Sequence, residues 1–211
     1  MPGLQVKSPA ALMAHTRAQR TAMAQLLTDL TETQWQSPSL CRGWTVGHVA
    51  AHLTMPFRVT ATRLGRELLR ARCTVDRALD RIAREDLAEL GREGVLASLW
   101  ANIDHAWTPP GGGPVGSLAH DVIHGLDITD ALGLPPVSPP ERVAVVVEES
   151  RDRLARFGVD LAGYRLEASD VDVTVGQGGT RCLLPAAQIL LVCTGRRSVA
   201  EAVARARHES V

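Results

Sequence analysis

Residues 120–128 of this 211-residue chain read HDVIHGLDI, in which two histidines stand four positions apart. Four residues are just over one helical turn, so His120 and His124 would point to the same side of a helix. Asp127 follows His124 by three positions and would lie near the same face. The stretch therefore predicts a helix that presents two imidazoles and a carboxylate together.

Helical patterns also precede this stretch. Apolar residues recur at steps of three and four, which predicts helices over residues 9–30, 46–55, 63–70, 72–84 and 84–100. Ser8, Thr45 and Ser117 stand where N-caps are expected, and Gly133 with the prolines after it should end the helix of residues 118–133. Pro56 should kink or interrupt the second helix. Residues 9–133 thus predict a bundle of four main helices.

The pattern changes after the proline-rich residues 134–140. A helix is predicted over residues 141–157, and alternating residues predict strands at 164–168 and 171–175. A glycine-rich turn at 176–179 leads into residues 181–184, and two short helices follow at 185–194 and 198–206. We therefore expect an α+β chain, with a helical bundle in residues 1–136 and a small α+β domain in residues 137–211.

Composition narrows the class of protein. Lys and Arg together number 23, as do Asp and Glu, and this zero net charge argues against a nucleic-acid or membrane-surface binder. No apolar run approaches the roughly 20 residues that span a bilayer, and the first residues do not resemble a signal peptide. We expect a soluble, cytoplasmic protein that binds neither nucleic acid nor membranes. The four scattered cysteines form no C-x-x-C pair and predict no disulfide framework.

A second histidine pair with the same spacing, His48 and His52, lies in the helix predicted over residues 46–55. Facing helices of a bundle build metal sites from side chains of this kind. Two ligands from one helical turn and a third from another helix would leave a coordination position open, as in catalytic metal centres. Histidines at this spacing can equally be solvated or hydrogen-bonded in a core, so the spacing alone leaves metal binding open.

Two longer motifs contain these histidines. Residues 35–53, WQSPSLCRGWTVGHVAAHL, and residues 120–128 resemble the mycothiol-dependent maleylpyruvate isomerase family, whose members are DinB-like metal-binding four-helix bundles. Residues 171–175, VDVTV, and 184–196, LPAAQILLVCTGR, resemble the sterol-carrier-protein-like C-terminal domain of that family. The resemblance thus covers nearly the whole chain.

The resemblance implies a ligand set. It selects His52, His120 and His124 as metal ligands and leaves His48 a supporting or surface role. Three neutral imidazoles suit Zn²⁺, and also Ni²⁺, Fe²⁺ or Cu²⁺. Asp127 would hydrogen-bond a ligand imidazole or a metal-bound water, or would only be an exposed carboxylate of the helix. Arg196 would reach across the domain interface to a substrate carboxylate, or would only complement the dipole at a helix end.

The resemblance also implies an activity. The metal would activate mycothiol, a low-molecular-weight thiol, for transfer to a small electrophilic substrate or for isomerisation of an activated double bond. The partners would then be this thiol and a small molecule, with the chain a monomer or a homodimer. Two alternatives use the same residues: a non-catalytic metal- or ligand-binding module, and a metal-dependent hydrolase with Asp127 as base. Cys41 has no evident base beside it, and Trp35 and Trp44 should anchor the connecting loop.

Overall fold

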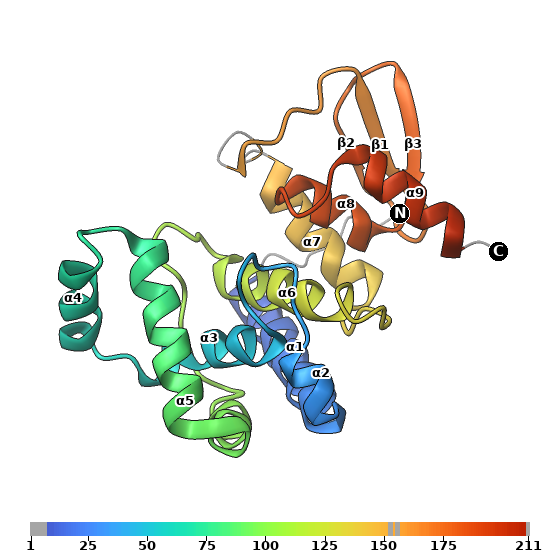
Figure 1. Cartoon of the computed structure of the whole chain (residues 1–211). Coiled ribbons are helices and arrows are strands. Elements are labelled where there is room, and N and C mark those ends of the chain that lie inside the picture. Colours follow the sequence, from blue (N-terminus) through green and yellow to red (C-terminus); the bar gives the residue numbers. More distant parts are fainter. Residues whose placement is uncertain (1–7, 152–153, 155–156, 210–211) are drawn as a thin grey trace.

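The computed structural model describes residues 8–151, 154 and 157–209. A helical N-terminal part is followed by a unit with a small sheet, which confirms the predicted α+β class (Figure 1). The helical part contains α1 (Pro9–Asp29), α2 (Glu32–Gln36), α3 (Val46–Arg58), α4 (Ala61–Arg70), α5 (Val75–Ala101) and α6 (Gly116–Thr129). The second unit contains α7 (Pro140–Ser150), β1 (Tyr164–Ala168), β2 (Thr174–Val175), β3 (Thr180–Leu184), α8 (Ala186–Cys193) and α9 (Val199–Glu209).

Four helices form the predicted bundle. Helix α1 packs against α5 and α6, and α3 packs against the same two helices, so the four close into a ring. The short helix α2 covers one end through α3, and α4 lies outside the ring against α5. Because α3 and α6 are neighbours in this ring, side chains on their facing sides can meet inside the bundle.

Local capping explains where the bundle helices begin. Ser8 accepts a hydrogen bond from the Ala11 N–H and Pro9 follows at the first helical position, as expected for α1. Thr45 caps α3, in a capping box whose other half is the imidazole of His48. Helix α3 runs through Pro56 and ends two residues later. The expectation that Ser117 caps α6 was wrong, because α6 already begins at Gly116.

The predicted boundary between two helices at Arg84 was also wrong. Helix α5 continues from Val75 to Ala101, and its break lies at Gly91, with φ 62° and ψ −175°. A side chain strongly disfavours this backbone conformation, and glycine adopts it readily. The single glycine, rather than the charged run before it, divides the long helix.

The second unit holds three strands in the order β2-β1-β3. Strand β2 pairs antiparallel with β1, and β3 pairs parallel to β1 with Leu166 opposite Cys182. The strand predicted over 171–175 shortens to Thr174–Val175, and the helix predicted over 141–157 ends at Ser150, with residues 152, 153, 155 and 156 outside the described part. The 176–179 turn passes so close to β1 that a Cβ on Gly178 would lie 2.0 Å from the carbonyl carbon of Gly163.

Helix α6 contributes to two hydrophobic clusters. Ile128 belongs to the cluster inside the bundle, with residues of α1, α3 and α5. Leu118, Val122 and Leu126 belong instead to the cluster formed with α7, α8 and the sheet. Helix α6 lies before the domain boundary that the sequence predicts between residues 136 and 137, and the second unit lies after it. One hydrophobic cluster therefore contains residues from both sides of this boundary.

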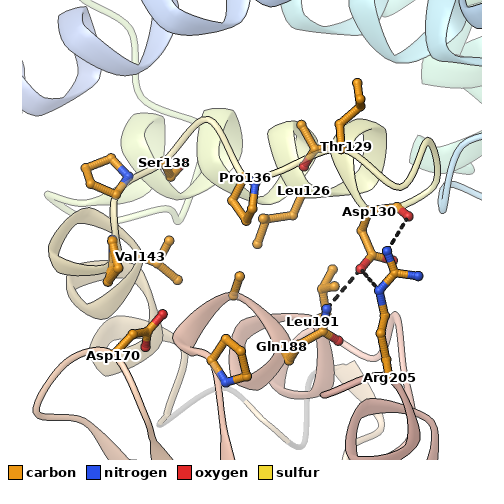
Figure 2. A pocket seen from close by; sticks show the side chains of 15 residues that line it. Leu126, Thr129, Asp130, Pro136, Ser138, Val143, Asp170, Gln188, Leu191 and Arg205 are labelled. Carbon is orange, nitrogen blue, oxygen red and sulfur yellow. Dashed lines mark hydrogen bonds and ion pairs between the residues drawn. The ribbon is translucent and has the colours of Figure 1, made fainter. Parts of the chain in front are cut away.

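A cavity of about 360 Å³ lies where the two parts meet, between the end of α6, the proline-rich connection and α8 (Figure 2). Asp130 stands at its edge, accepts hydrogen bonds from Gln188 and Arg197, and forms an ion pair with Arg205. None of His52, His120 and His124 lines this cavity. Within the described residues, no helix combines the length and apolar character needed to cross a membrane.

Candidate metal centre

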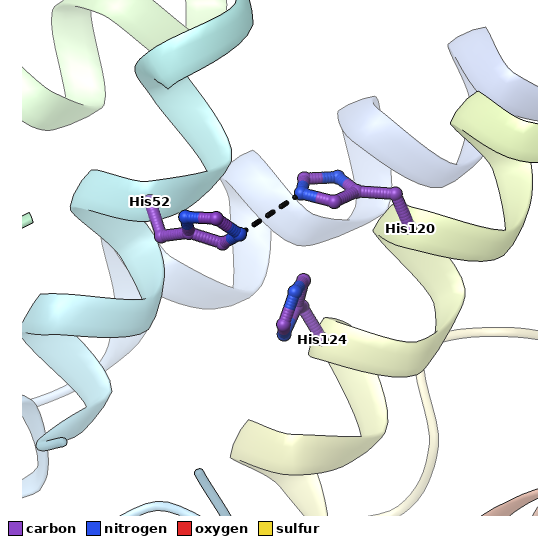
Figure 3. A group of neighbouring side chains, drawn as sticks. All are labelled: His52, His120 and His124. Carbon is purple, nitrogen blue, oxygen red and sulfur yellow. Dashed lines mark hydrogen bonds between the residues drawn. The ribbon is translucent and has the colours of Figure 1, made fainter. Parts of the chain in front are cut away.

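Three imidazoles meet between α3 and α6. His120 and His124 stand one turn apart on α6, and His52 faces them from α3 (Figure 3). The Nε2 atoms of His52 and His120 are 3.2 Å apart, and one ring nitrogen of each of the three histidines lies within 4.8 Å of the others. The structure therefore brings together the three histidines that the resemblance selects, and His48 lies outside the group.

The second nitrogen of each ring already has a partner. His120 Nδ1 lies 2.9 Å from Asp121 Oδ1, and His124 Nδ1 lies 2.9 Å from Asp127 Oδ2. His52 Nδ1 lies 3.2 Å from the Met55 sulfur. Because ionised carboxylates and a thioether only accept, each Nδ1 is assigned the hydrogen and each Nε2 is left with a lone pair.

This arrangement fits a metal ion. Two lone pairs that face each other across 3.2 Å repel unless a cation lies between them. Two nitrogens bound to one tetrahedral Zn²⁺ at about 2.0–2.1 Å are about 3.4 Å apart, close to the observed separation. Three imidazole nitrogens leave a fourth position open, as in catalytic rather than structural zinc sites.

Burial keeps the rings in the form that binds metals. Burial and the neighbouring histidines His124 and His120 hold the pKa of His52 well below its usual value, although Asp127 opposes them. Burial also lowers the pKa of His124, although the hydrogen bond that its ring donates to Asp127 opposes this. Both rings are therefore neutral near pH 7, and no proton competes with a metal there.

Asp127 is fully buried beside His124, and both of its oxygens are occupied. Besides the His124 ring, it accepts hydrogen bonds from Arg196 Nε at 3.0 Å and Arg196 Nη2 at 3.2 Å. Burial alone would raise the pKa of this carboxyl, but the His124 hydrogen bond and the Arg196 charge outweigh it, and the pKa falls well below the usual range. Asp127 is therefore a fixed anion.

Arg196 reaches the centre from the second unit. It follows Gly195, whose φ of 71° turns the chain after α8, and its remaining Nη1 donates to the Thr194 carbonyl. The side chain crosses the interface, and its guanidinium pairs with Asp127 of this same chain. The contact with a substrate carboxylate that the resemblance implies stays a prediction. One fifth of the side chain stays exposed.

Cys41 is a neighbour of the centre, and the expectation that it has no base beside it was wrong. Its sulfur lies 3.1 Å from Asp127 Oδ2 and 3.7 Å from His124 Nδ1. Burial first, and then Asp127, raise the pKa of this thiol, so it stays protonated and donates to the carboxylate. Cys41, His124 and Asp127 form a second group with the spacing of metal ligands, but the Arg196 cation already occupies the carboxylate. The only sequence signal was that Cys41 belongs to the same motif as His52.

Two tryptophans stand beside the histidines. The Trp44 ring centroid is 5.1 Å from that of His52, and Trp44 Nε1 donates to Asp80. The Trp107 ring lies edge-on to His120 with centroids 5.3 Å apart. Trp35 is buried and donates to the Leu27 carbonyl, which is the anchoring role expected for it.

Comparison with known proteins finds one similar family domain. A family model described as the mycothiol maleylpyruvate isomerase N-terminal domain matches residues 16–116. Residues 16–116 are thus similar to this family domain. The match runs from within α1 to the first residue of α6, so the matched region includes His52 and stops short of His120 and His124.

Solved structures include similar chains. A crystal structure of the mycothiol-dependent maleylpyruvate isomerase aligns with a TM-score of 0.47 and 16% identity, over 91% of each chain. A mutant of the same isomerase aligns with a TM-score of 0.47 and 15% identity, over 90% of each chain. No curated protein matches the chain.

Proposed function

We propose that this protein is a metal-dependent enzyme that uses a low-molecular-weight thiol of the mycothiol type. It would either transfer this thiol to a small electrophilic substrate or use the thiol to isomerise that substrate. The observation that carries the proposal is the convergence of His52, His120 and His124, each with its Nδ1 already partnered. The family of the bundle supplies the class of thiol and of reaction.

The three Nε2 atoms would hold the metal. Nitrogen donors of this kind favour Zn²⁺, and Ni²⁺ or Fe²⁺ would accept the same set. When bound, such an ion would lower the pKa of a thiol at the open position and so supply a thiolate near neutral pH.

The protein groups around the ligands have separate tasks. Asp127 accepts the Nδ1–H of His124 and so keeps Nε2 of that ring free. Arg196 holds Asp127 with two hydrogen bonds and balances its charge, and its exposed part can still attract an anionic substrate. Cys41 is a protonated donor to Asp127, so the nucleophilic thiol has to come from the cosubstrate.

Two other functions use the same centre. Hydrolysis with Asp127 as base is not favoured, because both oxygens of this buried carboxylate are engaged and its pKa is low. A module that binds metal without catalysis has the same ligand geometry, and a measured thiol-transfer rate separates it from the enzyme.

Metal analysis tests the ligands. The purified protein should hold one metal ion per chain, and His52→Ala or His124→Ala should lose it. His48→Ala is the matched control, since His48 lies one turn before His52 on α3 and only caps the helix. Metal that is retained in both ligand variants would refute this assignment.

Activity tests the reaction class. With the metal bound, the protein should accelerate conjugation of a low-molecular-weight thiol to a small activated alkene, and removal of either the metal or the thiol should abolish the reaction. Metal binding without any acceleration would favour the non-catalytic module. Turnover without thiol would favour hydrolysis.

A further inference from the structure

The ligand ring of His120 is held by a second, separate pair of buried charges. Asp121 follows His120 directly in the chain and is 4% exposed. Its Oδ1 lies 2.9 Å from His120 Nδ1, and its Oδ2 accepts a hydrogen bond of 2.8 Å from Arg20 Nε. The carboxylate therefore bridges the imidazole and a guanidinium from α1.

Arg20 is fixed from several sides. The residue is 4% exposed, and its Nη1 donates to the carbonyl of His105 at 2.6 Å. Its guanidinium also stands over the ring of Phe57, 5.1 Å from the centroid. Contacts with the segment after α5 and with α3 thus hold the arginine in one place, and the arginine in turn holds Asp121.

The arrangement repeats what Asp127 and Arg196 do for His124. On each side, an imidazole Nδ1 meets a buried carboxylate that is paired with an arginine. The two arginines come from opposite ends of the chain, one from α1 and one from the segment after α8. Each pair satisfies a buried carboxylate, which would otherwise be costly to keep in the core.

We infer that Asp121 and Arg20 are positioning residues for His120, which keep the hydrogen on Nδ1 and present Nε2 to the metal. An ionised carboxylate can only accept a hydrogen bond, so its partner nitrogen must carry the hydrogen. Arg20 keeps the carboxylate turned toward the ring and balances its charge. The inference rests on the proposed function only in taking His120 as a metal ligand.

Asp121→Asn tests this role, because the side chain keeps its size and loses its charge. Zn²⁺ affinity, measured by competition with a chelator, should fall by about 10- to 100-fold, as is typical when a carboxylate behind a ligand histidine is lost. Asp104→Asn is the matched control. Asp104 pairs with Arg17, which also belongs to α1, but both side chains are mostly exposed and neither contacts His120. The control should bind Zn²⁺ like the unaltered protein.

The second readout needs neither metal nor activity. Nitrogen NMR of the histidine rings in the metal-free protein should show His120 with its hydrogen on Nδ1, and Asp121→Asn should shift the population toward the Nε2–H form. Arg20→Gln keeps the carboxylate, so it should keep this tautomer and weaken Zn²⁺ binding less than Asp121→Asn does. If Arg20→Gln leaves the Zn²⁺ affinity unchanged, Arg20 is not a positioning residue for His120.

Two results would overturn the role of Asp121: an Nε2–H tautomer of His120 in the unaltered protein, or unchanged Zn²⁺ affinity in Asp121→Asn. The first needs no variant, so it decides the question even if Asp121→Asn fails to fold. A protein that binds neither Zn²⁺ nor Ni²⁺ nor Fe²⁺ would refute the proposed function. The tautomer of His120 would still decide whether Asp121 positions the ring.

Discussion

An imidazole binds a metal only through a nitrogen that carries no hydrogen, so the partner of its other nitrogen matters as much as the position of the ring. In this centre the partners are two carboxylates and a thioether. Both carboxylates are buried and paired with arginines, so each accepts the Nδ1 hydrogen of its histidine and leaves the Nε2 lone pair facing the centre. The charge of a bound metal would then be largely uncompensated by its ligands and available to an anionic thiol or substrate.

The thiol of Cys41 is predicted to be dispensable. Cys41→Ser should retain thiol-transfer activity and change Zn²⁺ affinity by less than about tenfold, because a hydroxyl can donate to Asp127 as the thiol does. Steady-state rates and chelator competition measure the two effects. Cys41→Ala, which removes the donor, should have the larger effect on affinity. Loss of all activity in Cys41→Ser with the metal still bound would instead identify Cys41 as the nucleophile.

At the scale of elements, the break in α5 depends on one residue. Gly91→Ala should lower the free energy of unfolding by about 1–3 kcal/mol, because alanine is strained at φ 62° and ψ −175°. Gly65→Ala is the opposite case. Gly65 lies within α4 with no atom near its missing Cβ, so alanine there should raise stability by about 0.5–1 kcal/mol. Denaturant unfolding of both variants measures the two changes in the free energy of unfolding. Stabilisation by Gly91→Ala would contradict the assigned strain.

The attachment of α4 to α5 is predicted to weaken in acid. Glu67 of α4 accepts hydrogen bonds from Arg66, Arg70 and Arg81, the last of which belongs to α5. Burial raises the pKa of Glu67, but these arginines outweigh it and the pKa is lowered.

A lowered folded-state pKa means that the stabilisation is complete above the unfolded value of about 4.3 and is lost as the pH falls below it. Glu67→Gln should therefore differ most from the unaltered protein near pH 6, and the difference should shrink as the pH falls below about 4. Urea unfolding across this range measures it. A difference that does not change with pH would show that Glu67 contributes through packing rather than charge.

At the scale of the molecule, α6 joins the bundle to the second unit, since it carries two of the three histidines proposed as ligands and contributes to both hydrophobic clusters. Asp127 and Asp130 of the same segment bind arginines that follow α8. The proposed metal centre therefore depends on both parts of the chain.

We expect the whole chain to unfold in a single calorimetric transition, because the cluster around Leu126 belongs to both parts. Leu126→Ala should lower stability by about 2–5 kcal/mol and move that one transition to lower temperature. Two separate transitions, of which only one moves in the variant, would mean that the predicted domains of residues 1–136 and 137–211 fold independently.

The sequence by itself determined the features that arise within a few residues of one another. The helical periodicity, the caps at Ser8 and Thr45 and the spacing of His120 and His124 all depend on the geometry of a single helical turn. The motif resemblance added His52 from a second helix. The break at Gly91 could not be predicted, because a glycine inside a helical pattern is compatible with both a continuous helix and a kink.

Only the tertiary structure decided which groups support the ligands. Arg20 and Asp121 are 101 positions apart, Cys41 and Asp127 are 86 apart, and Arg196 and Asp127 are 69 apart. Asp121 was also missed although it adjoins His120, because neighbouring residues on a helix do not normally face each other. Such contacts depend on how α1, α6 and the segment after α8 pack, which no local pattern in the chain records.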